Sequence, residues 1–418
     1  MQKILIKKDP VFLENQDFKT ILIKVMFPYE EKEEDIAKFA VLPSLLNSYC
    51  DKYPTEDEFY KMKDKLHILF LRCGNQVIGT TGCLSFHMVI PDTYTFEEDV
   101  LEEQFSFMNE VIYHPLIREN AFPEKELERE KRSIYNSLDN AVRNMRSYQD
   151  IQLRKLMDDE GILSRDLIQH RKELEDLTGE ELYQFYQQYI TNNQPAIYIM
   201  GNVDKDRITS LSKKYLYLKN FKEKEFIPHF YYYLKPRKKV IEVEEESTFK
   251  DSSLSYTYRI RDMKKEDKVT LSVVKDLLSS LSSRLLQQKL RNEMDLIYSS
   301  SVVTYSNFGV FEITVFIHKD HVEKTKKAIV EVLEDLKKEE VISPLIENIK
   351  KRNKANLLRE LDDKYFLIDD FARKDLGVDD SLEEFYQKVD KVTAKDVKEI
   401  LDRMVLDVIY FLKEGENE

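Results

Sequence analysis

The chain has 418 residues, 42% of them hydrophobic, which is enough to build two or more globular domains. Its 65 basic and 78 acidic residues give a net charge of -13 without a basic stripe, which excludes nucleic acid as an expected partner. With only 9 glycines and no glycine-rich phosphate loop, the sequence also argues against a nucleotide-dependent enzyme.

The first half of the chain alternates strand and helix patterns. Apolar periodicity predicts strands at residues 18–27, 65–71, 76–90 and 196–200, and helices at residues 30–49, 96–113 and 123–157. Pro43 falls inside the first helix and is expected to kink it, because proline lacks an N–H donor. Thr178 and Glu181 have the spacing of a capping box, which predicts the start of a further helix.

The second half repeats this order of elements after a segment without periodicity. Residues 215–238 are rich in Lys and Tyr and are predicted to be a linker. Strands are predicted at residues 239–243, 254–259, 298–305, 308–317 and 405–412, and helices at residues 268–291, 322–340 and 343–361. Gly309 is expected at the turn between two of these strands, and Thr393 is expected to cap a last helix.

Residues 178–200 and 393–411 share one pattern, a capped helix, a short gap and an apolar strand. We therefore predict an α+β fold of two homologous halves related by duplication, each a mostly antiparallel sheet packed with helices. The predicted boundaries are 1–214 for the first half, 215–238 for the linker and 239–418 for the second half.

The cysteines indicate the compartment. Cys50, Cys73 and Cys83 are odd in number and lack the spacing of metal ligands, so we expect reduced thiols in a cytoplasmic protein. Residues 1–9 carry charges too early for a signal peptide. No run approaches the roughly 20 apolar residues of a membrane span, so no membrane partner is expected.

A junction near residue 291 combines two side chains suited to holding a peptide. Arg291 lies where a predicted helix ends, and Tyr298 lies where the next strand begins. A guanidinium is a forked donor to carbonyls and carboxylates, and a phenol is both a donor and a flat wall. The alternative is purely structural, an Arg in a salt bridge and a Tyr packed in the core.

The same junction resembles a known signature. Residues 283–299 are similar to the second-half motif of the insulinase/pitrilysin-type metallopeptidases, roughly S-R-L-F-x-x-L-R-E-x-x-G-L-A-Y-S, with Asn292 at its Glu and Asp295 at its Gly. In that family the Arg and Tyr lie over the substrate in the active-site chamber, so the resemblance implies substrate binding by Arg291 and Tyr298. Residues 115–138 and 201–204 also match in family order.

The resemblance fails at the family's zinc site. The family binds zinc through His-x-x-Glu-His on a first-half helix and a later Glu on another helix. Aligning residues 36–54 places Ala40 and Ser44 at the two His positions and Pro43 at the Glu, and Ser137 falls at the last ligand. These side chains cannot replace imidazole and carboxylate ligands, so we expect no metal and no other cofactor on this chain.

The histidines elsewhere give no convincing substitute. His318 and His321 are three residues apart just beyond an alternating strand, and a solvated turn is the better interpretation than a metal site. His67 and His87 are lone residues in strand-like contexts, typical of surface or hydrogen-bonded core histidines.

The resemblance is to the zinc-less, non-catalytic member of a bacterial heterodimeric peptidase pair. It implies that a homologous, zinc-bearing subunit with His-x-x-Glu-His is the partner, that a peptide is the substrate, and that this chain alone is not a peptidase. The alternative is an inactive structural or interaction protein of the same fold, like the core subunits that this family supplies to respiratory complexes. An active peptidase acting alone would need a metal motif that this sequence lacks.

Overall fold

The structure is a computed structural model that describes residues 4–5, 9–94, 98–158, 161–165, 167–219, 225–226, 228–279 and 285–415. The chain forms two compact units, and each takes a short segment from the other half of the sequence. Unit 1 consists of Met1–Ala141, Arg165–Phe230 and Asp363–Asp379, and unit 2 of Val142–Ser164, Tyr231–Asp362 and Asp380–Glu418. These units exchange segments, whereas the predicted halves, 1–214 and 239–418, are continuous in sequence. The boundaries of the predicted halves stay a prediction.

Unit 1 is built on a five-stranded sheet with the order β2-β6-β3-β5-β4. Its strands are β2 (Val11–Glu14), β3 (Thr20–Glu30), β4 (Phe70–Ile78), β5 (Thr81–Pro91) and β6 (Ala196–Gly201). The β2–β6 pair is parallel, and the other pairs are antiparallel. A separate two-stranded sheet joins β1 (Ile4–Leu5) to β7 (Glu225–Phe226).

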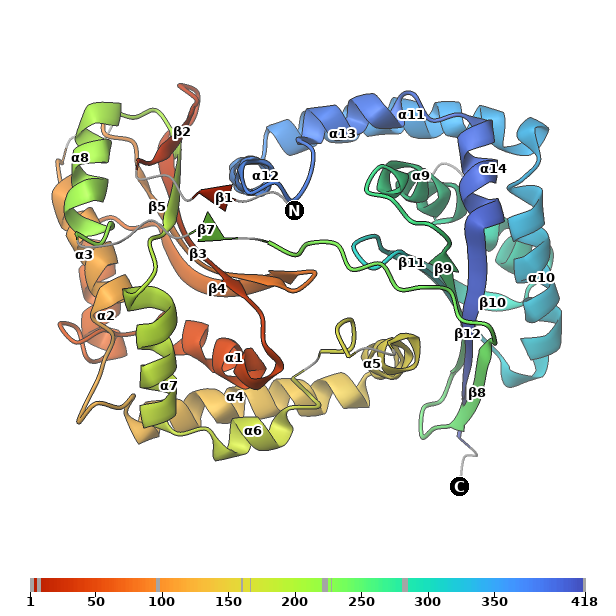
Figure 1. Cartoon of the computed structure of the whole chain (residues 1–418), viewed down its shortest axis with the longest axis horizontal. Helices are drawn as coiled ribbons and strands as arrows, with labels where there is room; N and C mark the ends of the chain where they lie inside the picture. The colour runs from red at the N-terminus through yellow and green to blue at the C-terminus, as the bar shows by residue number, and fades with distance from the viewer. Residues whose placement is uncertain are drawn as a thin grey trace. The chain divides into compact units, whose positions relative to one another are not determined.

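Unit 2 has a second five-stranded sheet, with the order β10-β11-β9-β12-β8 (Figure 1). Its strands are β8 (Ile241–Glu246), β9 (Ser252–Ile260), β10 (Ile297–Tyr305), β11 (Val310–Ile317) and β12 (Met404–Lys413). In each sheet the first strand, β2 or β8, lies at one edge and is parallel to the last strand, β6 or β12. The third strand, β4 or β10, lies at the opposite edge. This shared topology confirms the predicted fold of two homologous α+β halves with mostly antiparallel sheets.

Helices cover both sheets. Unit 1 holds η1 (Glu33–Asp35), α1 (Ile36–Leu45), α2 (Glu56–Lys65), α3 (Leu101–Tyr113), most of α4 (Glu124–Arg143), α6 (Arg171–Asp176), α7 (Gly179–Tyr186), η2 (Gln187–Thr191), α8 (Lys205–Tyr215) and α12 (Lys364–Asp375). Unit 2 holds α5 (Met145–Met157), α9 (Asp267–Ser279), η3 (Gln287–Glu293), η4 (Lys319–His321), α10 (Val322–Asp335), α11 (Glu339–Leu361), α13 (Leu382–Val389) and α14 (Ala394–Arg403).

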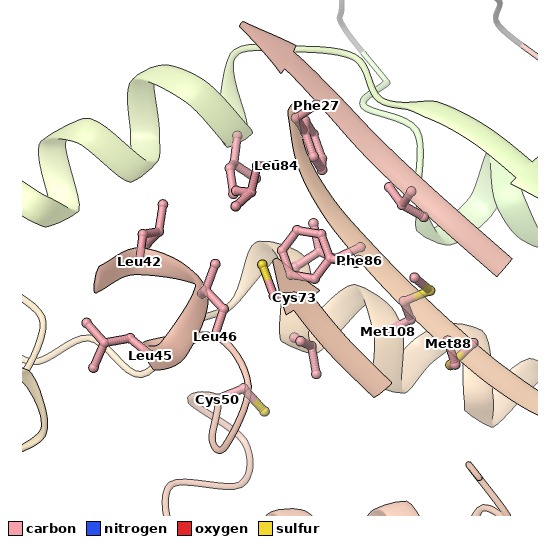
Figure 2. Close-up of a cluster of buried hydrophobic side chains, with 14 of the residues drawn as sticks. Phe27, Leu42, Leu45, Leu46, Cys50, Cys73, Leu84, Phe86, Met88 and Met108 are labelled. Carbon is pink, nitrogen blue, oxygen red and sulfur yellow. The ribbon is translucent and has the colours of Figure 1, made fainter. Parts of the chain in front are cut away.

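The core of unit 1 lies between its sheet and its own helices. Figure 2 shows Leu42, Leu45 and Leu46, at the end of α1, beside Cys73 of β4 and Phe86 of β5. All five side chains are buried, so this face of α1 is committed to packing.

Several expectations are confirmed residue by residue. Thr178 closes a capping box with Glu181, and Thr393 closes another with Asp396. Gly309 has a φ of +68° at the turn between β10 and β11, a conformation that glycine adopts without strain.

The predicted turn between the strands at residues 65–71 and 76–90 was wrong. Residues 65–69 are not a strand, because α2 ends at Lys65, and the two strands run over 70–78 and 81–91. The turn is at Gly79, whose φ of +65° lets the chain reverse in two residues. The predicted helix 123–157 is also two helices, because Asn144 leaves the helical conformation and its side chain caps α5.

Other predicted helices begin or end differently in the structure. The first helix, expected over 30–49, ends at Leu45, two residues after Pro43, with a single 3-10 turn before it. The helix expected over 268–291 is α9 followed by the π-helical turn η3, and residues 280–284 lie outside the described residues. Helices α2, α6, α8, α12 and α13 were not predicted from the sequence.

Each sheet also carries, on the face away from its own core, a helix from the other half of the sequence. On the unit 1 sheet, Asp369 and Asp375 of α12 pair with the buried Lys24 amine and with the Tyr198 hydroxyl. On the unit 2 sheet, the buried Gln149 of α5 donates to Ser255 at 2.7 Å. These faces therefore carry buried polar pairs, and the one under α5 also holds an apolar cluster around Leu153, Met157 and Val408.

Candidate functional site

The π-helical turn η3 brings the chain from α9 into the edge strand β10. Leu290 is buried and anchors the turn, and its carbonyl accepts a hydrogen bond from the Leu296 N–H at 2.7 Å. The Asp295 N–H donates to the Arg291 carbonyl at 3.1 Å. Asp295 has a φ of +52°, which explains why the family motif has glycine there and why Asp, tolerant of this conformation, can replace it.

Tyr298 is the extra residue of a β-bulge at the start of β10. Ile297 pairs with Ile317 of β11 and Ser299 pairs with Phe316, so Tyr298 has no residue opposite it. A bulge bends the strand and redirects the side chain of the inserted residue. As a result Tyr298 is 44% exposed, rather than packed in the core.

The surroundings of the Tyr298 ring are polar and mostly acidic. The ring meets His318 edge-on, with 4.9 Å between ring centroids, and His318 lies 6.1 Å from the His321 ring. The pKa of the Tyr298 hydroxyl is raised, first by partial desolvation and then by the carboxylates of Asp251, Glu414 and Asp295. A neutral phenol with a free hydroxyl can donate a hydrogen bond to a carbonyl oxygen.

Arg291 is exposed at the end of the π-helical turn. Within the described ranges, neither its guanidinium nor the Tyr298 hydroxyl has a hydrogen-bond or ion-pair partner. The structure thus places both predicted residues on one exposed junction with their polar groups available. Two neighbours of this junction, His318 and Arg146, were not identified from the sequence. Arg146 donates a hydrogen bond to the Ser299 hydroxyl at 3.2 Å and lies over the Phe316 ring.

The four positions aligned with the zinc ligands lie in unit 1. Ala40 and Ser44 are half-buried one turn apart on α1, and Pro43 is buried beside them. Ser137 is exposed on α4, where its hydroxyl donates to the Ser133 carbonyl at 3.1 Å. Two of these side chains have no donor atom for a metal, and serine hydroxyls do not replace imidazole or carboxylate, so this set does not fit zinc.

Acidic side chains, cysteines and histidines elsewhere in the described part of the chain do not gather in groups of three or more that could hold a metal ion. His318 is exposed and precedes the short η4 turn, and His321 is the half-buried last residue of that turn, so the predicted solvated turn is confirmed only at His318. His67 lies at the surface against Glu98 at 2.8 Å. His87 is inside the polar face of the unit 1 sheet, where burial and the nearby Lys24 lower its pKa to about 4.

Comparisons with known proteins bear on the fold and on the family resemblance. Residues 176–353 match the sequence profile of the peptidase M16 inactive domain. The "Probable inactive metalloprotease YmfF" of Bacillus subtilis is 22% identical over 96% of this chain and 94% of its own length. A conserved protein from Enterococcus faecalis has a similar structure, with a TM-score of 0.88 and 20% identity over 100% of this chain and 99% of that one.

A longer relative contains a similar structure within one chain. The periplasmic protease PqqL of Escherichia coli superposes with a TM-score of 0.67 and 13% identity over 95% of this chain, but over only 43% of its own length.

The chain is therefore similar to the insulinase/pitrilysin-type peptidases, the M16 family, and its residues 176–353 match the inactive domain of that family. Among the residues that the structure describes, every helix is too short or too polar to cross a membrane.

Proposed function

We propose that the chain is a non-catalytic subunit that completes the substrate chamber of a zinc-dependent peptidase. In this proposal a homologous subunit with His-x-x-Glu-His binds the zinc, and this chain contributes peptide binding through Arg291 and Tyr298. The two chains form a heterodimer in the cytoplasm of a bacterium, and the cytoplasmic part of the proposal is supported by free thiols, two of them buried.

One observation carries the proposal. The junction exposes a guanidinium and a phenol that have no partner among the described residues, and a bulge in the strand turns Tyr298 outward. A scaffold would gain more from a salt bridge and a packed ring, because exposed aromatic surface contributes nothing to the core. The PqqL chain supports the pairing. This chain matches 43% of the length of PqqL, so one PqqL polypeptide is long enough to hold two such structures.

The test is to reconstitute the pair with a zinc-bearing relative and to vary the junction. Arg291→Ala and Tyr298→Phe should each lower the kcat/KM of peptide cleavage, while Arg291→Lys should not restore it fully because lysine lacks the planar fork. Loss of one charge-assisted contact in a closed site is worth on the order of 2–3 kcal/mol, or roughly 30- to 150-fold in rate.

Two control variants separate this effect from general damage. Arg261→Ala removes an exposed charge from the same unit, and Tyr365→Phe removes the hydroxyl of another exposed tyrosine. Both controls should leave cleavage unchanged. If the junction variants also cleave at the wild-type rate, the motif is scaffold, and the structural protein resembling respiratory-complex core subunits becomes the better proposal.

A metal analysis tests the other part of the proposal. The purified chain should contain no stoichiometric zinc, because Ala40, Pro43, Ser44 and Ser137 occupy the ligand and base positions. One zinc per chain that resists a mild chelator contradicts the proposed division of roles, whatever the junction variants do.

A further inference from the structure

Unit 2 has a groove of about 470 Å³ between the edge strand β8 and the first turns of α10. Its floor is apolar and includes Ile409 and Phe411 of β12. Both the strand side and the helix side are lined with charged residues, which are Glu242, Glu244, Lys319, Asp320, Glu323, Lys326 and Lys413. The groove is large enough for several side chains of a peptide, and its lining can recognise charge.

The positive charges of the groove are already neutralised, whereas part of the negative charge is not. Each of the three lysines has an ion pair, Lys413 with Glu246 at 2.8 Å, Lys326 with Glu323 at 3.1 Å and Lys319 with Glu414 at 3.4 Å. Lys413 also lies 4.0 Å from Glu244, a longer and weaker contact. Within the described ranges, Glu242 and Asp320 have no such partner. A ligand entering the groove therefore meets carboxylates that lack a counter-charge, above an apolar floor.

The strand that forms one wall is an edge strand. β8 is the last strand of its sheet and pairs, in parallel, with β12. Glu242 and Glu244 are two residues apart, so their side chains project from the same face of the strand. An extended peptide added to such an edge places every second side chain on one face, where lysines or arginines would meet the two glutamates.

The turn after β11 links the groove to the Arg291 and Tyr298 junction, although β8 and β10 are the opposite edge strands of the unit 2 sheet. His318 touches the Tyr298 ring, and the next residue, Lys319, lines the groove. Glu414 pairs with Lys319 and also acts on the Tyr298 hydroxyl. Both features therefore lie at the same end of the unit 2 sheet.

We propose that the groove binds an extended, basic segment of the peptide that passes Tyr298, with lysine or arginine at alternate positions. The inference rests on the proposed peptide-binding function and adds a substrate class to it, because an acidic segment would face the uncompensated carboxylates. The chain alone is sufficient for this binding, since every lining residue belongs to unit 2.

The test measures peptide binding to the purified chain by fluorescence anisotropy at low and high salt. The probe is a fluorescein-labelled peptide in which lysine alternates with threonine or leucine, and its control has glutamate in place of each lysine. The groove variant combines Glu242→Gln, Glu244→Gln and Asp320→Asn. A matched variant makes the same change in charge elsewhere in unit 2, through Glu339→Gln, Glu340→Gln and Glu399→Gln, all exposed positions.

The lysine peptide should bind in preference to the glutamate peptide, and more weakly at high salt. The groove variant should weaken this binding about tenfold, because it removes three contacts each comparable to a surface ion pair. The matched variant should change it less than twofold. Equal losses in both triple variants, or equal binding of the two peptides, overturn the groove assignment.

The outcome is separable from that of the proposed function. If the lysine peptide fails to bind but Arg291→Ala still slows cleavage by the reconstituted pair, the groove inference is wrong and the subunit role stands. If the peptide binds in the groove while the junction variants cleave normally, the preference for basic segments holds without the role assigned to Arg291 and Tyr298.

Discussion

A buried carboxylate in unit 2 makes stability depend on pH in a way that can be measured at one residue. Glu312 lies on β11, under α5, and only 4% of it is exposed. It accepts hydrogen bonds from the hydroxyls of Thr314 at 2.9 Å and Tyr305 at 3.3 Å. Burial, followed by the charge of Asp150, raises its pKa to about 7 from an ordinary value of 4.5.

The sign of the effect follows from which state binds the proton more tightly. Between pH 4.5 and 7 the folded chain keeps Glu312 protonated while the unfolded chain does not, so folding stability falls as pH rises. At about 1.4 kcal/mol per pKa unit, the contribution of Glu312 to the unfolding free energy should drop by about 2.5 kcal/mol between pH 5 and pH 8.

Glu312→Gln removes this titration and keeps a side chain of similar size. Relative to wild type, the variant should gain about 2.5 kcal/mol of unfolding free energy when the pH rises from 5 to 8. Urea unfolding followed by circular dichroism gives both values, and hydrogen exchange of the β11 amides assigns the change to unit 2. Glu339→Gln, at an exposed position, is the control and should follow wild type. If the Glu312→Gln and wild-type stabilities keep a constant difference across this range, the carboxylate is not destabilised by burial.

Three further predictions concern stability. Asp369→Ala should cost about 2 kcal/mol because it leaves the buried Lys24 amine without its carboxylate, and Lys24→Met in the same chain should recover much of the loss. Gly79→Ala should lower the free energy of unfolding by at least about 2 kcal/mol, measured by thermal unfolding, because the new Cβ would lie 2.4 Å from a backbone carbonyl oxygen. Gly161→Ala is the control. Gly161 has a similar φ but open space around it, so this variant should cost only about 1 kcal/mol. Thr178→Ala should cost about 1 kcal/mol in urea unfolding by removing a capping box, and an unchanged midpoint would show that the cap is redundant.

Helix starts are the most predictable local feature of this sequence. The capping-box spacing that located Thr178 and Thr393 occurs again at Thr55 and Ser381, where it starts α2 and α13. These two helices could therefore have been predicted from the sequence by the same rule. The hairpin turn at Gly79 was harder, because residues 70–78 carry few apolar side chains at alternate positions.

The exchange of segments between units could not be predicted from local patterns. Helix α12 follows the second-half helices in sequence, yet its Asp369 pairs with Lys24 of the first-half sheet. Short-range periodicity reports which face of a helix is apolar, but it does not report which sheet that face meets. The same limit applies to the bulge at Tyr298, which depends on the register of β10 against β11.

The two halves share a topology, but the regions that correspond to the family's motifs differ in backbone strain and side-chain exposure. On α1, the positions aligned with the zinc ligands hold small or apolar side chains, and the helix end packs Leu42, Leu45 and Leu46 into the core. Nothing there is strained or left without a partner in order to bind a ligand. The η3–β10 junction is different, because it combines a left-handed Asp295, a bulge and an exposed aromatic ring. Each of these features lowers stability unless binding offsets it, since strained backbone and unpacked rings persist where a site uses them. This contrast is what the proposed subunit role predicts, namely no metal site in one half and a peptide-binding surface in the other. The kcat/KM of the reconstituted pair that carries Tyr298→Phe tests that surface.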